Sequence, residues 1–417
     1  MTKKALYITL DGLTDQLGGS QILPYVLWLA RAGHGMTILS CEKRRNFTPE
    51  ARARVADQLA DAGVQWEHVF YTERPPVLSG LWDRRQLLRA ARGLLRESRY
   101  DLVHCRSYIP AQVGLMLKSR ARPAPKLVFD MRGFWADEKA EVGAWPQNRL
   151  PFRAIYHYFK GVEERLVRGS DAIVSLTEAG REEIQGWPAY RGSPAPPPIT
   201  VIPCCVDTNH FPLATQADKR AAKAALGLPP DAPVLGYLGA IGGWYMVDEM
   251  LAFFAGLKRR RPEARMLFVT RSHPDTVVPK LSAHGLAPDD ILMRSAQRHE
   301  VPGLLAAMDL GLSFIKPTYA KTASSPTKQA EYLACGVPIV TNDRIGDNRT
   351  LIGPAPGCAV LEDLQPDTLE RAAAETEFGE GDEVALDARA QALRAHAVEH
   401  FDLKVGGARY GAIYDAV

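Results

Sequence analysis

The chain has 417 residues, with 51 Lys and Arg against 48 Asp and Glu, so its net charge is only +3, and 46% of its residues are hydrophobic. Such an even balance lacks the basic excess typical of nucleic-acid-binding proteins, and we expect no nucleic-acid partner. The length is too great for one ordinary core and predicts two domains of roughly 200 residues each. We place these domains at residues 1–208 and 209–402.

The chain enters its first expected strand almost at once, with no apolar segment of the signal-peptide kind before it. No uninterrupted apolar run approaches the roughly 18 residues that a membrane-spanning helix needs. We therefore expect a cytoplasmic chain. The six cysteines show no C-x-x-C spacing, and we expect reduced thiols in the core and no metal site among them.

Short apolar runs alternate with helical stretches throughout, which is the pattern of doubly wound α/β sheets. The first half has expected strands at 5–10, 36–40, 64–70, 101–104, 126–129, 171–176 and 199–203. The second half has them at 233–239, 266–270, 290–293, 310–314, 338–341 and 358–361. The sequence therefore predicts two Rossmann-like domains, with a hinge near residues 206–213 after the proline-rich loop 192–198.

The first domain opens with a strand, a loop over residues 11–19 and a helix over residues 21–32. Gly18 and Gly19 come directly before the expected helix start, where backbone N–H groups bind phosphates well. A plain tight turn explains a Gly-Gly pair equally well.

Polar side chains follow two short buried strands of the first domain. They are His104 and Arg106 after one strand, and Asp130, Arg132, Asp137 and Glu138 after the next. Sites in doubly wound sheets form at the carboxyl ends of the strands, so we expect these side chains to face a cleft. A structural role for His104, bonded to a backbone carbonyl and orienting a loop, is an equal alternative to a direct one.

The segment 81–100 predicts an amphipathic basic helix. An apolar stripe is expected at Leu81, Leu87, Leu88, Leu94 and Leu95, with arginines elsewhere at Arg84, Arg85, Arg89, Arg92, Arg96 and Arg99. The simple interpretation is a helix packed on the sheet with a solvated arginine face. The alternative is docking on an anionic membrane surface, to which each basic residue contributes about 1 kcal/mol.

The second domain repeats the design of strand, glycine loop and helix. Gly239, Gly242 and Gly243 allow the backbone to approach a ligand closely. The aromatic side chains of Trp244 and Tyr245 are expected to pack between loop and helix.

The segment 310–342 predicts a strand, a loop, a short helix and another strand. Ser325 suits the N-cap and Pro326 the first helical position, while Gly336 ends the helix after about three turns. This helix start offers unpaired N–H groups and a partial positive charge to an anion.

Thr327 and Lys328 stand in the first turn of this helix, and Lys328 adds a full positive charge. Glu331 follows three residues later, where its carboxylate can accept hydrogen bonds from a pair of hydroxyls. A phosphate with a sugar is the ligand that fits this pattern. The simple alternative is a surface ion pair between Lys328 and Glu331.

The segment SPTKQAEYLACGVPIVTN resembles the nucleotide-sugar segment of family 4 of the retaining glycosyltransferases, which have the GT-B fold of two Rossmann-like domains facing across a cleft. That family carries a Glu-x7-Glu pattern whose second Glu, here Glu331, contacts the nucleotide ribose. The first Glu, which faces the donor sugar, is replaced by Ala323. The resemblance also implies that the last helix, about 403–417, packs back on the first domain.

The resemblance carries further site expectations. It implies that Gly18 and Gly19 approach the donor phosphates. Many family members have a His where this chain has Arg106 and Arg132, so the chain resembles the subset with Asp-x-Arg-Gly, and the catalytic polar group is Asp130, Arg132 or His104. The usual loop cations are absent because Ala240 follows Gly239 and no Lys precedes the next helix. A leaving diphosphate still needs cations, which points to Arg271 and Lys328.

The sequence thus predicts a retaining, metal-independent glycosyltransferase without a cofactor, which moves a sugar from a UDP- or GDP-linked donor to a hydroxyl of a saccharide or lipid-linked saccharide. Polysaccharide or glycoconjugate synthesis at the inner face of the membrane is the expected setting. A nucleotide-sugar epimerase of GT-B fold and a non-enzymatic sugar-binding protein remain alternatives. The expected catalytic residues are His104, Asp130, Arg132 and Lys328. The expected donor-binding residues are Gly18, Gly19, Gly239, Gly242, Arg271, Ser325, Thr327, Lys328 and Glu331.

Overall fold

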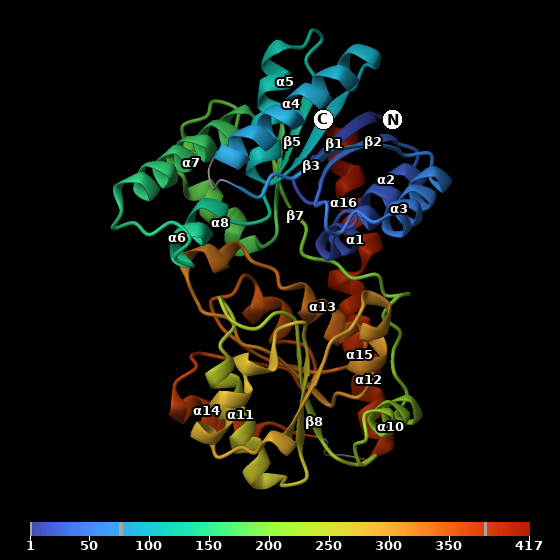
Figure 1. Ribbon diagram of the computed structural model, residues 1–417, viewed down its shortest axis with the longest axis vertical. Coiled ribbons are helices and arrows are strands. Elements are labelled where there is room, and N and C mark those ends of the chain that lie inside the picture. Colours follow the sequence, from blue (N-terminus) through green and yellow to red (C-terminus); the bar gives the residue numbers. More distant parts are fainter. Residues whose placement is uncertain (1, 75–77, 379–381) are drawn as a thin grey trace. The chain divides into compact units, whose positions relative to one another are not determined.

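The computed structural model describes residues 2–74, 78–378 and 382–417, and the chain forms two compact units, each on its own parallel sheet (Figure 1). Unit 1 runs from the N-terminus to Pro203 and adds Thr322–Ser324 and Leu403–Val417, and unit 2 comprises Cys204–Lys321 and Ser325–Asp402. The division after Pro203 comes earlier than the expected one after residue 208. Backbone N–H groups of Cys204 and Val206 already bond within unit 2, to the Ser325 hydroxyl and the Phe401 carbonyl.

Unit 1 contains seven strands among its described residues. Its strands are β1 (Lys4–Thr9), β2 (Gly35–Glu42), β3 (Gln65–Phe70), β4 (Leu102–Arg106), β5 (Lys126–Asp130), β6 (Ala172–Ser175) and β7 (Ile199–Val201). Its helices are α1 (Gln16–Gln21), α2 (Leu23–Arg31), α3 (Pro49–Asp61), α4 (Leu78–Glu97), α5 (Tyr108–Arg120), α6 (Trp135–Glu141), α7 (Leu150–Gly169), α8 (Glu178–Gly186), α9 (Pro188–Arg191) and α16 (Leu403–Ala416).

Unit 2 contains six strands among its described residues. Its strands are β8 (Val234–Leu238), β9 (Arg265–Val269), β10 (Ile291–Arg294), β11 (Leu310–Ser313), β12 (Ile339–Asn342) and β13 (Ala359–Leu361). Its α-helices are α10 (Gln216–Ala225), α11 (Val247–Arg260), α12 (Val301–Ala306), α13 (Thr327–Ala334), α14 (Pro366–Glu375) and α15 (Glu383–Phe401). A short 3-10 turn, η4 (Arg298–Glu300), precedes α12.

Both sheets are doubly wound. The strand order is β3-β2-β1-β4-β5-β6-β7 in unit 1 and β10-β9-β8-β11-β12-β13 in unit 2. The order reverses between β1 and β4 in the first sheet and between β8 and β11 in the second, which creates a switch point where ligands of such folds bind. The predicted fold class of two doubly wound α/β domains is confirmed, and every predicted strand is present.

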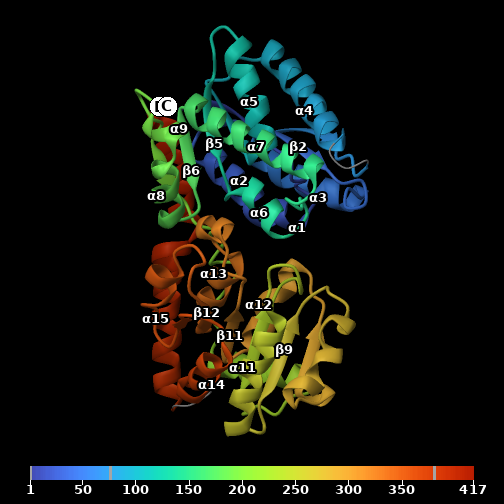
Figure 2. The same cartoon turned by 90° about the vertical axis from the view of Figure 1, so that its left-hand side faces the viewer.

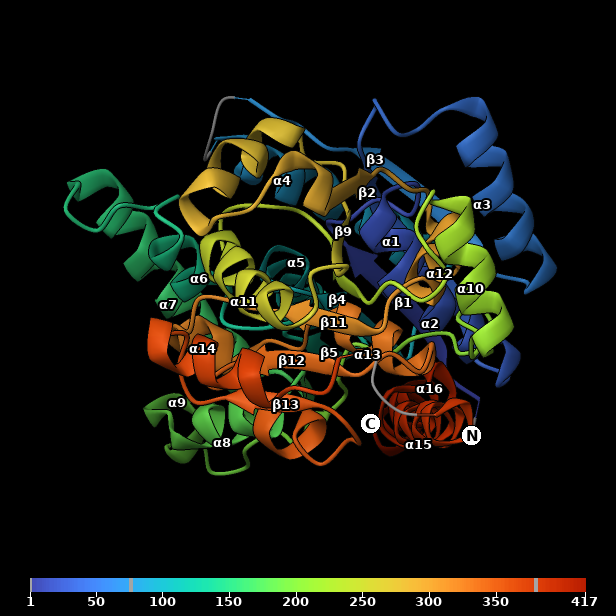
Figure 3. The same cartoon turned by 90° about the horizontal axis from the view of Figure 1, so that it is seen from below.

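Helices cover both faces of each sheet. In unit 1, α4, α5 and α7 pack side by side on one face, and α2 packs with α16 on the other (Figure 2). In unit 2, α11 packs with α14 on one face, while α13 packs with α15 on the other (Figure 3). Because both faces are covered, the strands are buried along nearly their whole length. In β1 and β4, for example, every residue from Ala5 to Thr9 and from Leu102 to Arg106 is buried.

The first helical segment differs from the prediction. Gly18 and Gly19 lie inside α1 and do not precede a helix start. A Cβ on Gly18 would lie 1.9 Å from the Gly12 carbonyl oxygen, so Gly18 permits close packing of α1 on the preceding loop. A Cβ on Gly19 would make only an ordinary contact, 3.9 Å from the Leu13 carbonyl oxygen. The expected phosphate loop at this glycine pair is therefore replaced by a packing contact.

The predicted basic helix is α4, although its apolar stripe is displaced. Leu87 and Leu94 are buried as expected, but Leu81 is 46% exposed and the neighbouring Trp82 is 55% exposed. Asp83 takes the buried position, where its carboxylate accepts a hydrogen bond from the Thr72 backbone N–H at 3.1 Å. The helix therefore presents both arginines and large apolar side chains to solvent.

The thiols are free, and five of the six are buried, so the expectation of reduced core cysteines is confirmed. Among the described residues, no helix combines the length and apolar character needed to cross a membrane.

Candidate active site

The expected site residues of unit 1 gather at the switch point, where we define the Asp130 cluster as Tyr7, His104, Arg106, Asp130 and Arg132. The strands are longer than predicted, so His104 and Arg106 lie within β4 and Asp130 ends β5, with Arg106 paired opposite Asp130 in the parallel register. They do not follow the strand ends as expected. The sheet continues because Arg106 also pairs with Thr9 of β1, which places these polar groups between neighbouring strands.

The Asp130 carboxylate is the centre of this cluster. It is fully buried, and its oxygens lie 3.7 Å from Arg106 Nη1, 3.8 Å from Arg132 Nη1 and 3.7 Å from His104 Nε2. Burial alone would raise the pKa of Asp130. The charges of Arg132 and Arg106, with the nearby His104 imidazole, outweigh burial and lower this pKa to about 2. The carboxylate is therefore ionised over the whole physiological range.

The C-terminal helix α16 completes the cluster, and sequence reasoning did not name its residues. The Tyr410 hydroxyl donates to Asp130 Oδ2 at 2.9 Å, and the Tyr414 hydroxyl lies 2.9 Å from His104 Nδ1. Burial lowers the pKa of His104, although Asp130 opposes this effect, so the imidazole is neutral at pH 7. This is the helix expected over about 403–417, but its tyrosines were not singled out, because their contacts with Asp130 and His104 arise only in the tertiary fold.

Arg132 and Gly133 occupy the left-handed region, with φ values of 58° and 110°. A non-glycine residue in this region is uncommon and stores strain. The turn directs the chain out of β5 immediately after Asp130, and it keeps the Arg132 guanidinium near the carboxylate of Asp130. This geometry gives a physical reason for the Asp-x-Arg-Gly pattern.

The loop between β1 and α1 is held by a buried carboxylate. Glu42, at the end of β2, accepts hydrogen bonds from the Leu13 N–H at 2.7 Å and from the Thr14 hydroxyl at 2.6 Å. Asp11 in the same loop lies 3.5 Å from Arg106 Nε. Glu42 therefore fixes the loop beside the Asp130 cluster.

Two further carboxylates expected near the site, Asp137 and Glu138, belong to α6. Asp137 is buried, accepts from the Tyr156 hydroxyl at 2.8 Å and pairs with Lys160 at 2.9 Å. These contacts join α6 to α7.

The second candidate half-site lies in unit 2 around α13. The helix starts at Thr327 with Pro326 in the N-cap position, and its eight residues make about two turns, one fewer than predicted. Ser325 is not the cap. Its hydroxyl accepts a hydrogen bond from the Cys204 N–H at 3.1 Å and anchors the start of unit 2.

Lys328 is buried in the first turn of α13, and within the described part of the chain its ammonium group has no hydrogen-bond partner. Nζ lies over the rings of Tyr237 and Tyr245, at 4.1 and 3.9 Å from their centroids. These cation–π contacts replace part of its lost hydration. Burial lowers the pKa of Lys328 to about 7, with only a weaker opposing effect of Glu331.

The glycine loop after β8 approaches this ammonium group. Gly239 has φ 124°, and a Cβ built on it would lie 3.1 Å from Lys328 Nζ, so a side chain here would meet the lysine. Gly242 also has positive φ, at 91°, with open space on its Cβ side. Trp244 and Tyr245 are held by backbone pairing with residues 314–316, in agreement with their expected packing role.

Glu331 pairs with a residue that sequence reasoning missed. Its buried carboxylate forms an ion pair with Arg298 of η4, whose guanidinium lies 4.6 Å from the Phe211 ring centroid. Burial raises the pKa of Glu331, and Arg298 acts against it. The surface pair of Lys328 with Glu331 is therefore excluded as the explanation of these residues, since both are buried and Glu331 is taken by Arg298.

Arg271 is exposed beyond the end of β9. Its Nη2 donates to the Gln297 side-chain oxygen at 3.1 Å and, weakly, to the Ala296 carbonyl at 3.4 Å. Lys321 is another buried cation of this unit, with Nζ 3.9 Å from the Trp244 ring centroid.

With this geometry in view, the chain can be compared with known proteins. The model of a family described as Glycosyltransferase Family 4 matches residues 25–210. This match and the relatives below support membership in glycosyltransferase family 4. The matched region covers most of unit 1, and it agrees with the family resemblance of the segment around α13.

Curated relatives of this chain include proteins named D-inositol 3-phosphate glycosyltransferase. The one from Catenulispora acidiphila is 26% identical over 268 residues, covering 61% of this chain and 57% of the relative. The one from Stackebrandtia nassauensis is 32% identical over 189 residues, covering 43% and 40%. The chain thus spans about half the length of the curated relatives it matches.

Solved structures show the same fold over the full chain. Sucrose-phosphate synthase from Thermosynechococcus elongatus superposes with a TM-score of 0.70 at 14% identity, covering 99% of this chain and 98% of that one. HepE from Anabaena, solved in complex with UDP and glucose, gives 0.69 at 15% identity with complete coverage of both chains. WaaG, a glycosyltransferase of lipopolysaccharide biosynthesis, gives 0.63 at 16%, covering 98% and 99%. These likenesses concern the fold.

Proposed function

We propose that this family 4 chain is a retaining glycosyltransferase that moves a sugar from a nucleotide sugar to a hydroxyl of a saccharide or lipid-linked saccharide. The observation that carries the proposal is the Lys328 ammonium group, buried without a hydrogen-bond partner beside the backbone of Gly239. An unpaired buried cation is costly, and an anion such as a diphosphate compensates it.

The surroundings of Lys328 supply the other parts of a donor site. The first N–H groups of α13 and the positive-φ loop at Gly239 and Gly242 offer backbone donors to phosphate oxygens. Thr327 lies next to Lys328 in the same turn. Glu331, held by Arg298, is the group proposed to accept from the ribose hydroxyls.

The chemistry follows from where charge develops. As the glycosidic bond breaks, negative charge grows on the leaving diphosphate, so a fixed ammonium group there stabilises the transition state more than the ground state. We propose that protein cations and helix N–H groups do this without a divalent metal. Within the described residues, no three His, Cys, Asp or Glu side chains form a group suited to a metal ion.

In unit 1, the Asp130 cluster is the proposed acceptor-side machinery. Asp130 is ionised and Arg132 is held in a strained turn, so both are pre-organised to bind hydroxyls or charged groups of the acceptor. His104 is buried, neutral and bonded to Tyr414, and we assign it a positioning role in this cluster.

The names of the similar proteins, and the ligands in two of the solved structures, support a nucleotide sugar as the donor. Several curated relatives are glycosyltransferases by name, and HepE was solved with UDP and glucose, and also with UDP-glucose. We propose a UDP- or GDP-linked sugar donor here. The proposal does not name the sugar, because Ala323 replaces the family Glu that faces it.

We also propose a cytoplasmic enzyme that works at the inner face of a membrane in cell-surface polysaccharide or glycoconjugate synthesis. The support is the outer surface of α4, where Arg85, Arg89, Arg96, Leu81 and Trp82 are exposed. Basic and large apolar side chains together suit an anionic lipid interface.

Thermal-shift screening of the full chain with UDP, GDP, ADP and their sugar conjugates tests the proposal. A ligand at 100 times its dissociation constant stabilises a protein by about 2.7 kcal/mol. We expect one nucleotide diphosphate and its sugar conjugate to raise Tm in the parent and not in Lys328→Met. Product analysis with a mixture of hydroxyl acceptors then measures transfer. Turnover of the donor with no acceptor present would favour an epimerase instead.

A further inference from the structure

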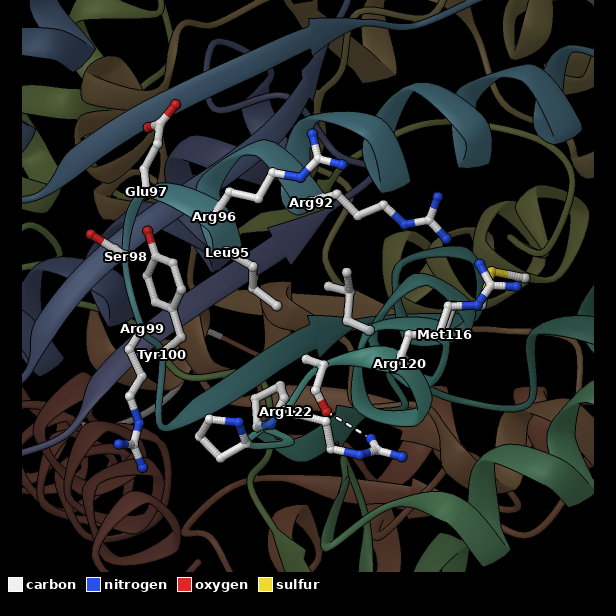
Figure 4. A pocket seen from close by; sticks show the side chains of 14 residues that line it. Arg92, Leu95, Arg96, Glu97, Ser98, Arg99, Tyr100, Met116, Arg120 and Arg122 are labelled. Carbon is white, nitrogen blue, oxygen red and sulfur yellow. Dashed lines mark hydrogen bonds between the residues drawn. The ribbon is translucent and has the colours of Figure 1, made fainter.

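A second basic site lies in unit 1, on the opposite edge of the sheet from the Asp130 cluster. A cavity of about 510 Å³ opens between the C-terminal ends of α4 and α5 and the loops that lead into β4 and β5 (Figure 4). It borders the amino ends of these strands, so β4 separates it from the cluster by about 15 Å. Neither the family comparison nor the proposed reaction assigns a role to it.

Arginines dominate the lining of this cavity. Figure 4 shows the guanidinium groups distributed around it, from α4, from α5 and from the connecting loops. The five are Arg92, Arg96, Arg99, Arg120 and Arg122, and the single carboxylate of the lining is Glu97. We call these five residues the arginine ring.

The charge of the ring is not balanced by the protein. Within the described part of the chain, Arg92, Arg96, Arg99 and Arg120 make no hydrogen bond or ion pair, and Arg122 donates only to the nearby Ala121 and Ser119 carbonyls. Two helix C-termini each contribute roughly half a negative charge. Together with Glu97, these helix ends leave a net charge of about +3 around the cavity. Five arginines spread over an ordinary surface would not concentrate this much charge in one place.

The shape of the cavity favours a small molecule over a flat surface contact. Its volume falls within the range of about 300 to 1,000 Å³ usual for small-ligand sites. Leu95, Met116 and Pro125 provide an apolar wall between the arginines, and the Tyr100 ring is fixed because its hydroxyl donates to Thr37 at 3.1 Å. Planar guanidinium groups bind phosphate oxygens in pairs, so several of them together match adjacent phosphates.

We propose that the arginine ring binds a small molecule with two or more adjacent phosphate groups, at a site separate from the donor site of unit 2. Such a ligand is either free in solution or the head group of a lipid. Binding there is independent of the proposed transfer reaction, because none of the ring residues belongs to the Asp130 cluster or to the surroundings of Lys328.

Titration calorimetry with inorganic tripolyphosphate tests the proposal on the full chain carrying Lys328→Ala, which removes the donor-site cation. We expect saturable binding, with one equivalent bound. The double variant Arg96→Gln/Arg120→Gln should weaken it at least tenfold, whereas Arg85→Gln/Arg89→Gln, which changes two exposed arginines of α4 outside the cavity, should change it less than twofold. Circular dichroism and Tm confirm that the variants are folded.

A vesicle measurement distinguishes the two sources of the ligand. Vesicles containing a bisphosphorylated inositol lipid are compared with phosphatidylserine vesicles of equal total charge. Binding that prefers the bisphosphorylated lipid and depends on Arg96 and Arg120 assigns a lipid head group, and tripolyphosphate binding without this preference assigns a soluble ligand. If neither probe binds, or if both double variants lose the same affinity, the arginine ring is a solvated surface and the proposal is wrong.

Discussion

Lys328 should make donor binding depend on pH in a way that no other described lysine does. Its pKa is lowered to about 7, so about three quarters of the protein carries a neutral lysine at pH 7.5. A diphosphate beside Nζ favours the ammonium form and raises this pKa on binding. Binding should therefore take up about 0.75 proton at pH 7.5. Affinity should fall roughly twentyfold between pH 6.5 and pH 8.5, since the protonated fraction falls by that factor.

The assay is titration calorimetry with the nucleotide-sugar conjugate, whose esterified diphosphate does not titrate in this range. Heats measured in two buffers of different ionisation enthalpy give the number of protons taken up. Lys328→Met should abolish the uptake and lower kcat about ten- to a hundredfold, which corresponds to loss of a charged hydrogen bond of roughly 1.5 to 3 kcal/mol. Lys316→Met, at an exposed position in the loop that follows β11, is the matched control. No proton uptake in the parent, or equal uptake in Lys328→Met, would refute the reasoning.

The same pKa has a consequence for the free protein. The neutral form is favoured on folding, so Lys328 destabilises the folded state increasingly as the pH falls from 10.5 towards 7, and fully below 7. The difference between these values sets an upper limit of roughly 5 kcal/mol. Lys328→Met should therefore be more stable than the parent at pH 6.5, and the gain should shrink at pH 9. Urea unfolding at the two values measures this difference.

Four further predictions concern the other groups. Glu331→Ala and Arg298→Ala should raise KM for the donor with little change in kcat, because the ribose does not change during the reaction; unchanged nucleotide binding by calorimetry would remove the ribose assignment. Asp130→Asn should cost about 3 to 5 kcal/mol in urea unfolding, since it leaves buried guanidinium groups uncompensated, and the parent should lose this contribution as the pH falls from 3.8 to about 2. EDTA should leave turnover largely intact, and complete loss restored by magnesium would contradict the metal-free route. Arg89→Glu with Arg92→Glu should reduce co-sedimentation with anionic liposomes, and equal sedimentation with neutral ones would return α4 to a packing role.

The fold was predictable because its signals are local. Each strand is a short apolar run between helical stretches, and β4 and β8 are recognisable from five buried or nearly buried residues alone. The errors lie where packing decides. Helix formation at Gly18 depends on its contact with Gly12, and the exposure of Leu81 depends on Asp83 having a buried backbone partner in Thr72.

The candidate site was predictable in part. Lys328 and Gly239 are far apart in sequence, yet each carried its own signal, a cation at a helix start and a glycine after a strand. Arg298 carried none, because its position beside Glu331 arises from the tertiary fold. Tyr410 reaches Asp130 from 280 residues away, which no local pattern reveals.

The two half-sites differ in how far the protein satisfies its own charges. Asp130 has two guanidinium groups within 3.8 Å and a tyrosine hydroxyl that donates to it, so the charge of its carboxylate is compensated within the Asp130 cluster. Lys328 has only aromatic faces and sits at the balance between charged and neutral forms. The half-site in unit 2 therefore changes its protonation when an anion arrives, whereas the one in unit 1 does not. If a step of the proposed reaction depends on pH, we therefore expect that step to be donor binding. The protonation state of the Asp130 cluster should not change over the same pH range.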